Sequence, residues 1–149
     1  MWVYLIDTNV VSELSKPDPD PTAAAWMAQT EPVECCLSLL TLAELERGVV
    51  LLEAKGAVTK ARRIRQWLTT VEDDYAGRIL PVTAPVTHAW ANLPTNRTFP
   101  GIDSLIAATA IAHNLTVVTR NTKDFAATGA RCLDPFQPAP QPAQDNRAP

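Results

Sequence analysis

The apolar run Val-Tyr-Leu-Ile at residues 3–6, followed at once by Asp7, decides the fold class of this chain. Apolar residues in succession, without polar alternation, are typical of a strand that is buried on both faces. Such strands form parallel sheets that helices cover on both sides. A carboxylate that ends a fully apolar strand is costly if it stays unpaired, so Asp7 is the first candidate for a functional residue.

Four further short apolar runs predict strands, and helical patterns separate them. The predicted strands cover residues 3–6, 35–37, 79–82, 116–119 and 131–133. The predicted helices cover residues 9–15, 22–30, 42–53, 58–71, 84–92 and 103–113,. This alternation predicts an α/β fold, a three-layer α/β/α sandwich around a central, mainly parallel five-stranded sheet.

Length and composition set the broad class of the protein. With 149 residues, of which 46% are hydrophobic and 19% charged, the chain suits one domain,. We expect that domain at residues 1–134 and a disordered tail rich in Pro, Gln and Ala at 135–149,. A net charge of −3 disfavours a general nucleic-acid coat protein but not a nucleic-acid enzyme,. The three cysteines form no disulfide or zinc pattern,. Because no signal peptide or membrane span is recognisable, we expect the cytoplasm.

Four acidic residues lie where the predicted sheet would place a functional site. Asp7 closes the first strand, Glu44 lies near the start of the helix after the second strand, Asp103 opens the buried helix, and Asp124 follows the fourth strand by five residues. In an open α/β sheet, sites form beyond the carboxyl ends of the strands, where the strand order reverses. We therefore expect the four carboxylates to converge although they are far apart in the sequence.

Each acid also has a purely structural interpretation. Glu44 completes a capping box with Thr41, in which its carboxylate accepts a backbone N–H,. Asp103 and Asp7 each suit the N-cap position of the helix that follows them. Asp124 suits a surface turn over residues 121–124. Because four independent structural explanations would have to hold together, the set as a whole favours a functional site.

Rival activities find less support in the residues. A phosphatase with an aspartyl nucleophile normally has a second Asp two residues after the first, where this chain has Asn9. The five glycines form neither of the two glycine-rich phosphate-binding patterns,. A non-catalytic binding module, with the acids as caps or partner contacts, stays open, and only an assay separates it from an enzyme.

Four stretches of the sequence resemble the motifs of one known family, in its order and spacing. They are residues 5–14 (LIDTNVVSEL), 38–48 (SLLTLAELERG), 103–110 (DSLIAATA) and 118–125 (VTRNTKDF). The chain resembles the PIN-domain ribonucleases, specifically the VapC/FitB-like toxins of type II toxin–antitoxin pairs, from residue 3 to about residue 133. Some relatives carry another acid where this chain has Asn121.

This resemblance implies an endoribonuclease that holds Mg²⁺ or Mn²⁺ with Asp7, Glu44, Asp103 and Asp124. Thr119 and Asn121 occupy the accessory polar positions of the family. A metal-activated water would hydrolyse the RNA and leave a 5′-phosphate and a 3′-hydroxyl. The resemblance also implies a homodimer and a cognate antitoxin that covers the site and carries its own DNA-binding domain. Two arginines close to the motifs, Arg47 and Arg120, are the candidates for contacting the scissile phosphate.

Overall fold

The computed structural model describes residues 1–139 and confirms the α/β fold. A sheet of five short strands forms its centre, with the order β3-β2-β1-β4-β5 and parallel pairing throughout. The strands are β1 (Tyr4–Ile6), β2 (Cys35–Ser38), β3 (Ile79–Leu80), β4 (Thr116–Val118) and β5 (Arg131–Leu133). The sheet predicted to be mainly parallel is therefore parallel at each pairing of these strands.

Helices connect the strands in the predicted order, with one addition. They are α1 (Thr8–Leu14), α2 (Pro21–Gln29), α3 (Leu39–Ala54), α4 (Val58–Asp74), α5 (Ala84–Ala91), α6 (Gly101–His113) and α7 (Thr122–Ala126), with a 3-10 turn η1 at Pro32–Glu34. The sequence predicted a turn where α7 lies, which was wrong, because five residues are too few for helical periodicity,. Within residues 1–139, none of these helices is long and apolar enough to cross a membrane.

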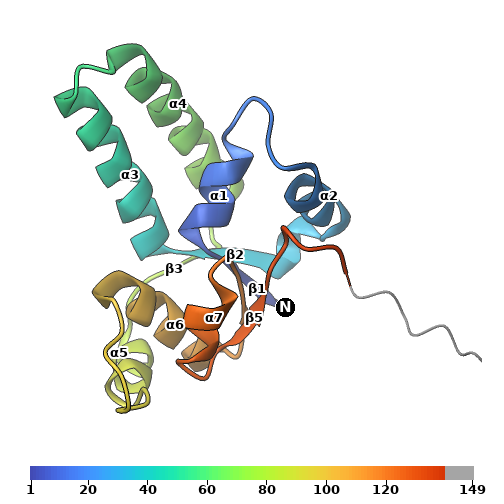
Figure 1. Ribbon diagram of the computed structural model, residues 1–149, viewed down its shortest axis with the longest axis vertical. Helices are drawn as coiled ribbons and strands as arrows, with labels where there is room; N and C mark the ends of the chain where they lie inside the picture. Colours follow the sequence, from blue (N-terminus) through green and yellow to red (C-terminus); the bar gives the residue numbers. More distant parts are fainter. Residues whose placement is uncertain (140–149) are drawn as a thin grey trace, which may run out of the picture.

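The apolar strands face two separate clusters, one on each side of the sheet. Leu5 and Val117 point toward the cluster that α6 and α7 complete, whereas Ile6 and Val118 point toward the cluster of α1, α3 and α4. Figure 1 shows α3 and α4 side by side as a long hairpin, and α5 against α6 on the other side of the fold. Burial of successive residues on opposite faces explains the continuous apolar pattern and confirms the three-layer sandwich.

The strand order reverses between β1, the central strand of the sheet, and β4, its neighbour. From β1 the chain builds outward to β2 and β3, and it then returns to the other side of β1 for β4 and β5. Asp7 and Thr119 directly follow β1 and β4 at this reversal. The backbone N–H of Asp7 donates to the carbonyl of Val118 (2.9 Å), which fixes the two strand ends beside each other.

The described contacts continue past residue 134, where we expected the domain to end. Phe136 packs against the cluster that contains Ile6 and Val118, and the Arg120 guanidinium lies 3.6 Å from the centroid of its ring. The domain boundary at 134 and the disordered tail stay predictions. Residues 140–149 of the predicted tail lie outside the part of the chain that the structure describes.

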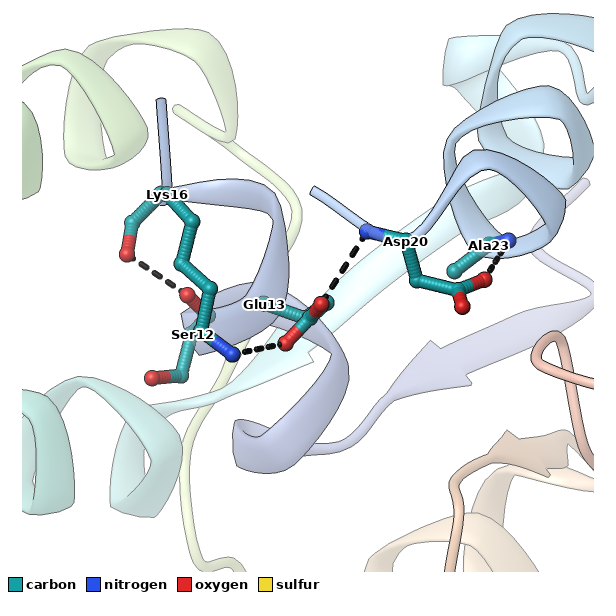
Figure 2. Close-up of polar contacts among 6 residues, drawn as sticks. Ser12, Glu13, Lys16, Asp20 and Ala23 are labelled. Atoms are coloured by element: carbon teal, nitrogen blue, oxygen red, sulfur yellow. Dashed lines mark hydrogen bonds and ion pairs between the residues drawn. The ribbon is translucent and has the colours of Figure 1, made fainter. Parts of the chain in front are cut away.

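A cluster of polar contacts fixes the connection from α1 to α2 (Figure 2). Glu13 on α1 accepts from the Lys16 ammonium and, at 3.0 Å, from the backbone N–H of Asp20. These hydrogen bonds, led by the one from Lys16, lower the pKa of Glu13. Asp20 in turn caps α2, because its carboxylate accepts from the backbone N–H groups of Thr22 and Ala23 (both 3.0 Å). The proline-rich loop is thereby attached at both ends.

Replacing Asp20 should therefore destabilise the domain, whereas replacing its neighbour Asp18 should not. Loss of an N-cap side chain costs about 1 kcal/mol. Asp20→Ala should lower the free energy of unfolding by that amount in urea titrations. Asp18 is exposed and makes no hydrogen bond among the described residues, so Asp18→Ala is the matched control. Equal unfolding midpoints for the two variants would show that the Asp20 cap does not stabilise the fold.

Candidate active site

Asp7 is the most deeply buried acid of the site, with 3% of its surface exposed. It ends β1 and also serves as the N-cap of α1, so the structural interpretation of this residue is correct. Its Oδ1 accepts from the backbone N–H of Thr8 and its Oδ2 from the hydroxyl of Thr119, both at 2.8 Å. Capping does not exclude a functional role, because each carboxylate oxygen has a second lone pair.

Burial raises the pKa of Asp7 from its usual 3.8 to about 6. The hydrogen bonds from Thr119 and Thr8 oppose that shift, because they stabilise the ionised form,. The negative charges of Asp103 and Glu44 add smaller contributions to the shift. Asp7 is thus a carboxylate that a nearby cation would stabilise in its ionised form.

The Thr119 hydroxyl has a fixed orientation. Thr119 is fully buried, and its Oγ1 accepts from the Asn9 side-chain amide (3.2 Å) and from the backbone N–H of Asn121 (3.0 Å). With both lone pairs engaged, its own hydrogen points to Asp7,. The Asn9 carbonyl oxygen accepts from the backbone N–H of Arg120 (3.3 Å). Asn9 therefore links the start of α1 to the segment after β4.

Glu44 is held by a hydroxyl rather than by a helix end. The Thr8 Oγ1 donates to Glu44 Oε1 at 2.7 Å and lies 3.3 Å from Thr41 Oγ1. The predicted capping box of Thr41 and Glu44 was wrong, because α3 begins at residue 39 with Ser38 as its N-cap. Glu44 therefore lies in the second turn of α3, free of a capping role.

Asp103 and Asp124 form the other side of the site. Asp103 lies in the first turn of α6, whose N-cap is Pro100, so the prediction of Asp103 as the N-cap was wrong. Burial and, secondarily, the charge of Asp124 raise the pKa of Asp103. Asp124 lies in the first turn of α7, is largely exposed, and pairs with Arg97 at 3.5 Å. The two acids line one pocket together with Arg97 and Phe99.

Pairwise charge interactions link the four predicted acids in a chain. The four carboxylates do not, however, surround a single point. The charges of Glu44 and Asp103 raise the pKa of Asp7, and the charge of Asp124 raises the pKa of Asp103. Among residues 1–139, no three Asp, Glu, His or Cys side chains form a ready metal-binding group. The donor set nevertheless fits a hard divalent ion, because it consists of carboxylate oxygens around a buried acid. Glu44 and Asp124 already have partners among the described residues, the Thr8 hydroxyl and the Arg97 guanidinium.

The other predicted residues, Asn121, Arg120 and Arg47, form no hydrogen bond or ion pair with the four acids within residues 1–139. Asn121 reaches Thr119 only through its backbone N–H, and its exposed side chain makes no hydrogen bond among the described residues. Arg120 stacks on Phe136, which holds its guanidinium against the C-terminal segment. Arg47 is exposed on α3, without an ion pair in the described part of the chain. The phosphate-contact roles of the two arginines stay predictions.

The structure adds three site residues that the sequence analysis did not single out. Thr8 and Asn9 directly follow Asp7 in the first motif, so their position was a usable signal for them. Arg97 had no such signal, because it lies between α5 and α6 in a segment without periodicity. Only the fold brings it beside Asp124.

A family model described as "PIN domain" matches residues 4–130. The chain belongs to the PIN-domain family. It is 36% identical to Toxin FitB of Neisseria gonorrhoeae over 90% of this chain and 99% of that protein. It is 35% identical to VapC ribonuclease Y4jK of Sinorhizobium fredii over 92% of this chain and 100% of that protein. These comparisons confirm the resemblance that the four motifs indicated.

Solved structures confirm the PIN fold. The crystal structure of FitAcB from Neisseria gonorrhoeae matches with a TM-score of 0.82 at 34% identity, covering 90% of this chain and 99% of that chain. The structure of FitAB bound to the IR36 DNA fragment matches with a TM-score of 0.77 at 33% identity, covering 91% and 96%. The sheet and its helices are therefore those of this PIN domain group.

The raised pKa of Asp7 predicts a specific pH dependence of stability. Between its ordinary pKa of 3.8 and about 6, Asp7 is ionised in the unfolded chain and protonated in the fold. Stability is therefore present at low pH and is lost as the pH rises to about 6, by about 3 kcal/mol in total. Asp7→Asn should remove this contribution, as measured by urea unfolding between pH 4 and 7 without divalent ions.

Asp18→Asn provides the control for that experiment, because Asp18 is an exposed carboxylate. Its pH dependence should follow that of the parent. If Asp7→Asn also follows the parent, Asp7 is not a buried acid with a raised pKa.

Proposed function

We propose that the protein is a Mg²⁺- or Mn²⁺-dependent endoribonuclease that acts as the toxin of a toxin–antitoxin pair. One observation carries the proposal: Asp7, a buried carboxylate, lies at the strand-order reversal, and the hydroxyl of the adjacent Thr8 holds a second carboxylate, that of Glu44. Such an arrangement stores electrostatic repulsion that a cation relieves. The names of two relatives, a toxin and a ribonuclease, support the activity.

Asp7 and Asp103 are the main metal ligands in this proposal, with Glu44 and Asp124 completing the acidic ring. A divalent ion bound there would supply a hydroxide from its bound water and neutralise charge on the scissile phosphate. Thr119 keeps the Asp7 carboxylate in place, and Thr8 does the same for Glu44. This mechanism does not use the 2′-hydroxyl group of RNA. A preference for RNA over DNA must therefore arise from substrate binding.

The expected partners follow from the same proposal. The chain would form a homodimer and bind an antitoxin, which covers the acidic site and carries its own DNA-binding domain. The structural match to FitAB on a DNA fragment supports a partner of this kind, because that assembly binds DNA as a complex. A non-catalytic module would share the fold and the antitoxin, and only cleavage separates the two functions.

Cleavage assays on purified protein test the activity. The parent should cut RNA in Mg²⁺ or Mn²⁺ and lose all cleavage in excess EDTA, with recovery when metal is restored. The products should carry a 5′-phosphate and a 3′-hydroxyl. Asp7→Asn and Asp103→Asn should reduce the rate by at least about a hundredfold while the fold is retained, because each removes a ligand charge. Cleavage that continues undiminished in EDTA would exclude the metal mechanism.

Metal affinity should also depend on pH, and the raised pKa of Asp7 predicts that it increases with pH. Because the ligand must be ionised, binding displaces a proton below about pH 6,. Calorimetric Mn²⁺ affinity should therefore rise by up to about tenfold per unit from pH 5 to 6 and level off above it. Affinity that stays constant over this range would show that Asp7 does not ligate the metal.

A further inference from the structure

Arg97 is placed differently from the other basic residues of the protein. It lies in the segment between α5 and α6, and its Nη2 is 3.5 Å from Asp124 Oδ1. The other two ion pairs within residues 1–139 join Lys16 to Glu13 and Arg65 to Glu53, away from the acidic site. Arg97 is thus the cation that the described structure pairs with one of the four acids.

The surroundings of Arg97 resemble a binding position more than a structural contact. Its side chain is 43% exposed and that of Asp124 is 65% exposed. The guanidinium lies 5.3 Å from the centre of the Phe99 ring, which gives it a second support besides Asp124,. Arg97, Phe99, Asp103 and Asp124 all line the same pocket, in which Arg97 pairs with Asp124.

The ion pair between Arg97 and Asp124 is easily exchanged. Exposed pairs with a single contact at this distance contribute little to stability, since water screens both charges. A guanidinium binds phosphate oxygens through the same fork of N–H groups that binds a carboxylate. Were Asp124 to bind a metal ion, Arg97 would lose this partner and would keep its contact with the Phe99 ring.

We propose that Arg97 is the phosphate-binding arginine of this site, pairing with Asp124 in the metal-free protein and with an RNA phosphate once the acids hold metal. This inference rests on the proposed function. The predictions for Arg47 and Arg120 are untested and stay open. Arg97 differs from both because it pairs with one of the four acids. Arg120 also stacks on an aromatic ring, that of Phe136, but it forms no ion pair with any of the four acids within residues 1–139.

Two binding measurements test the proposal, and they should change in opposite directions. In Arg97→Gln, Asp124 no longer has a competing cation, so calorimetry without RNA should show Mn²⁺ binding about two- to fivefold tighter. The same variant should bind RNA about tenfold more weakly, because it lacks a charge-assisted phosphate contact. RNA binding is measured by the fluorescence anisotropy of a fluorescein-labelled 12-nucleotide RNA of randomised sequence, with Ca²⁺ as the divalent ion in the buffer.

Two further variants serve as controls. Arg97→Lys keeps the charge but loses the fork, so it should restore the parental Mn²⁺ affinity and only part of the RNA affinity. Lys55→Gln removes the same unit of charge at the exposed end of α3 and should change neither measurement. A purely structural role for Arg97 would not tighten metal binding.

The outcomes separate this inference from the proposed function. Suppose that the parent binds Mn²⁺ and cuts RNA, but that Arg97→Gln binds both Mn²⁺ and RNA as the parent does. The proposed role of Arg97 is then wrong, and the proposed nuclease function is unaffected. If Arg97→Gln loses RNA affinity without gaining Mn²⁺ affinity, the pairing with Asp124 does not compete with metal and the exchange is overturned. If the parent neither binds Mn²⁺ nor cuts RNA, the proposed function itself fails.

Discussion

The hydrogen bond from the Thr119 hydroxyl to the Asp7 carboxylate joins the ends of β1 and β4, and the acidic edge of the sheet depends on it. Asp7 follows β1 and Thr119 follows β4, on the two sides of the strand-order reversal. Asn9 and the backbone of Asn121 orient that hydroxyl, so the bond has one direction. Glu44 and Asp103 lie near this fixed centre, and Asp124 lies beside Asp103.

This arrangement makes stability and function compete at one residue. Burial raises the pKa of Asp7 to about 6, which means that the fold would be more stable with a neutral group there,. Two hydrogen bonds recover part of that loss, and neighbouring acids increase it. Under the proposed function, the same charges that destabilise the fold would bind the metal ion.

The sequence predicted the sheet, and it pointed to the four acids as candidates, because both inferences rest on local patterns; the functional role of the acids stays a prediction. Continuous apolar runs mark buried parallel strands, and acids directly after them mark the carboxyl edge. Helix boundaries were less accurate, because caps depend on the tertiary fold. Ser38 rather than Thr41 caps α3, and Asp103 lies inside α6 instead of capping it. The five residues of α7 are too few to show a period.

Contacts between distant segments could not be predicted in the same way. The bond from Thr8 to Glu44 spans 36 positions, and nothing near Arg97 in the sequence indicates its approach to Asp124. Such contacts follow from the order of the strands, which the sequence alone did not determine. They matter for function because they set which acids are free and which already have a partner.

Anomalous diffraction from crystals soaked in MnCl₂ tests the central claim most directly, because it locates the ion itself. We predict a manganese peak about 2 Å from an oxygen of Asp7, with at least one further ligand from Glu44, Asp103 or Asp124. A peak elsewhere on the protein, or none at saturating Mn²⁺, would contradict the assignment of Asp7 as the centre of a metal-dependent active site.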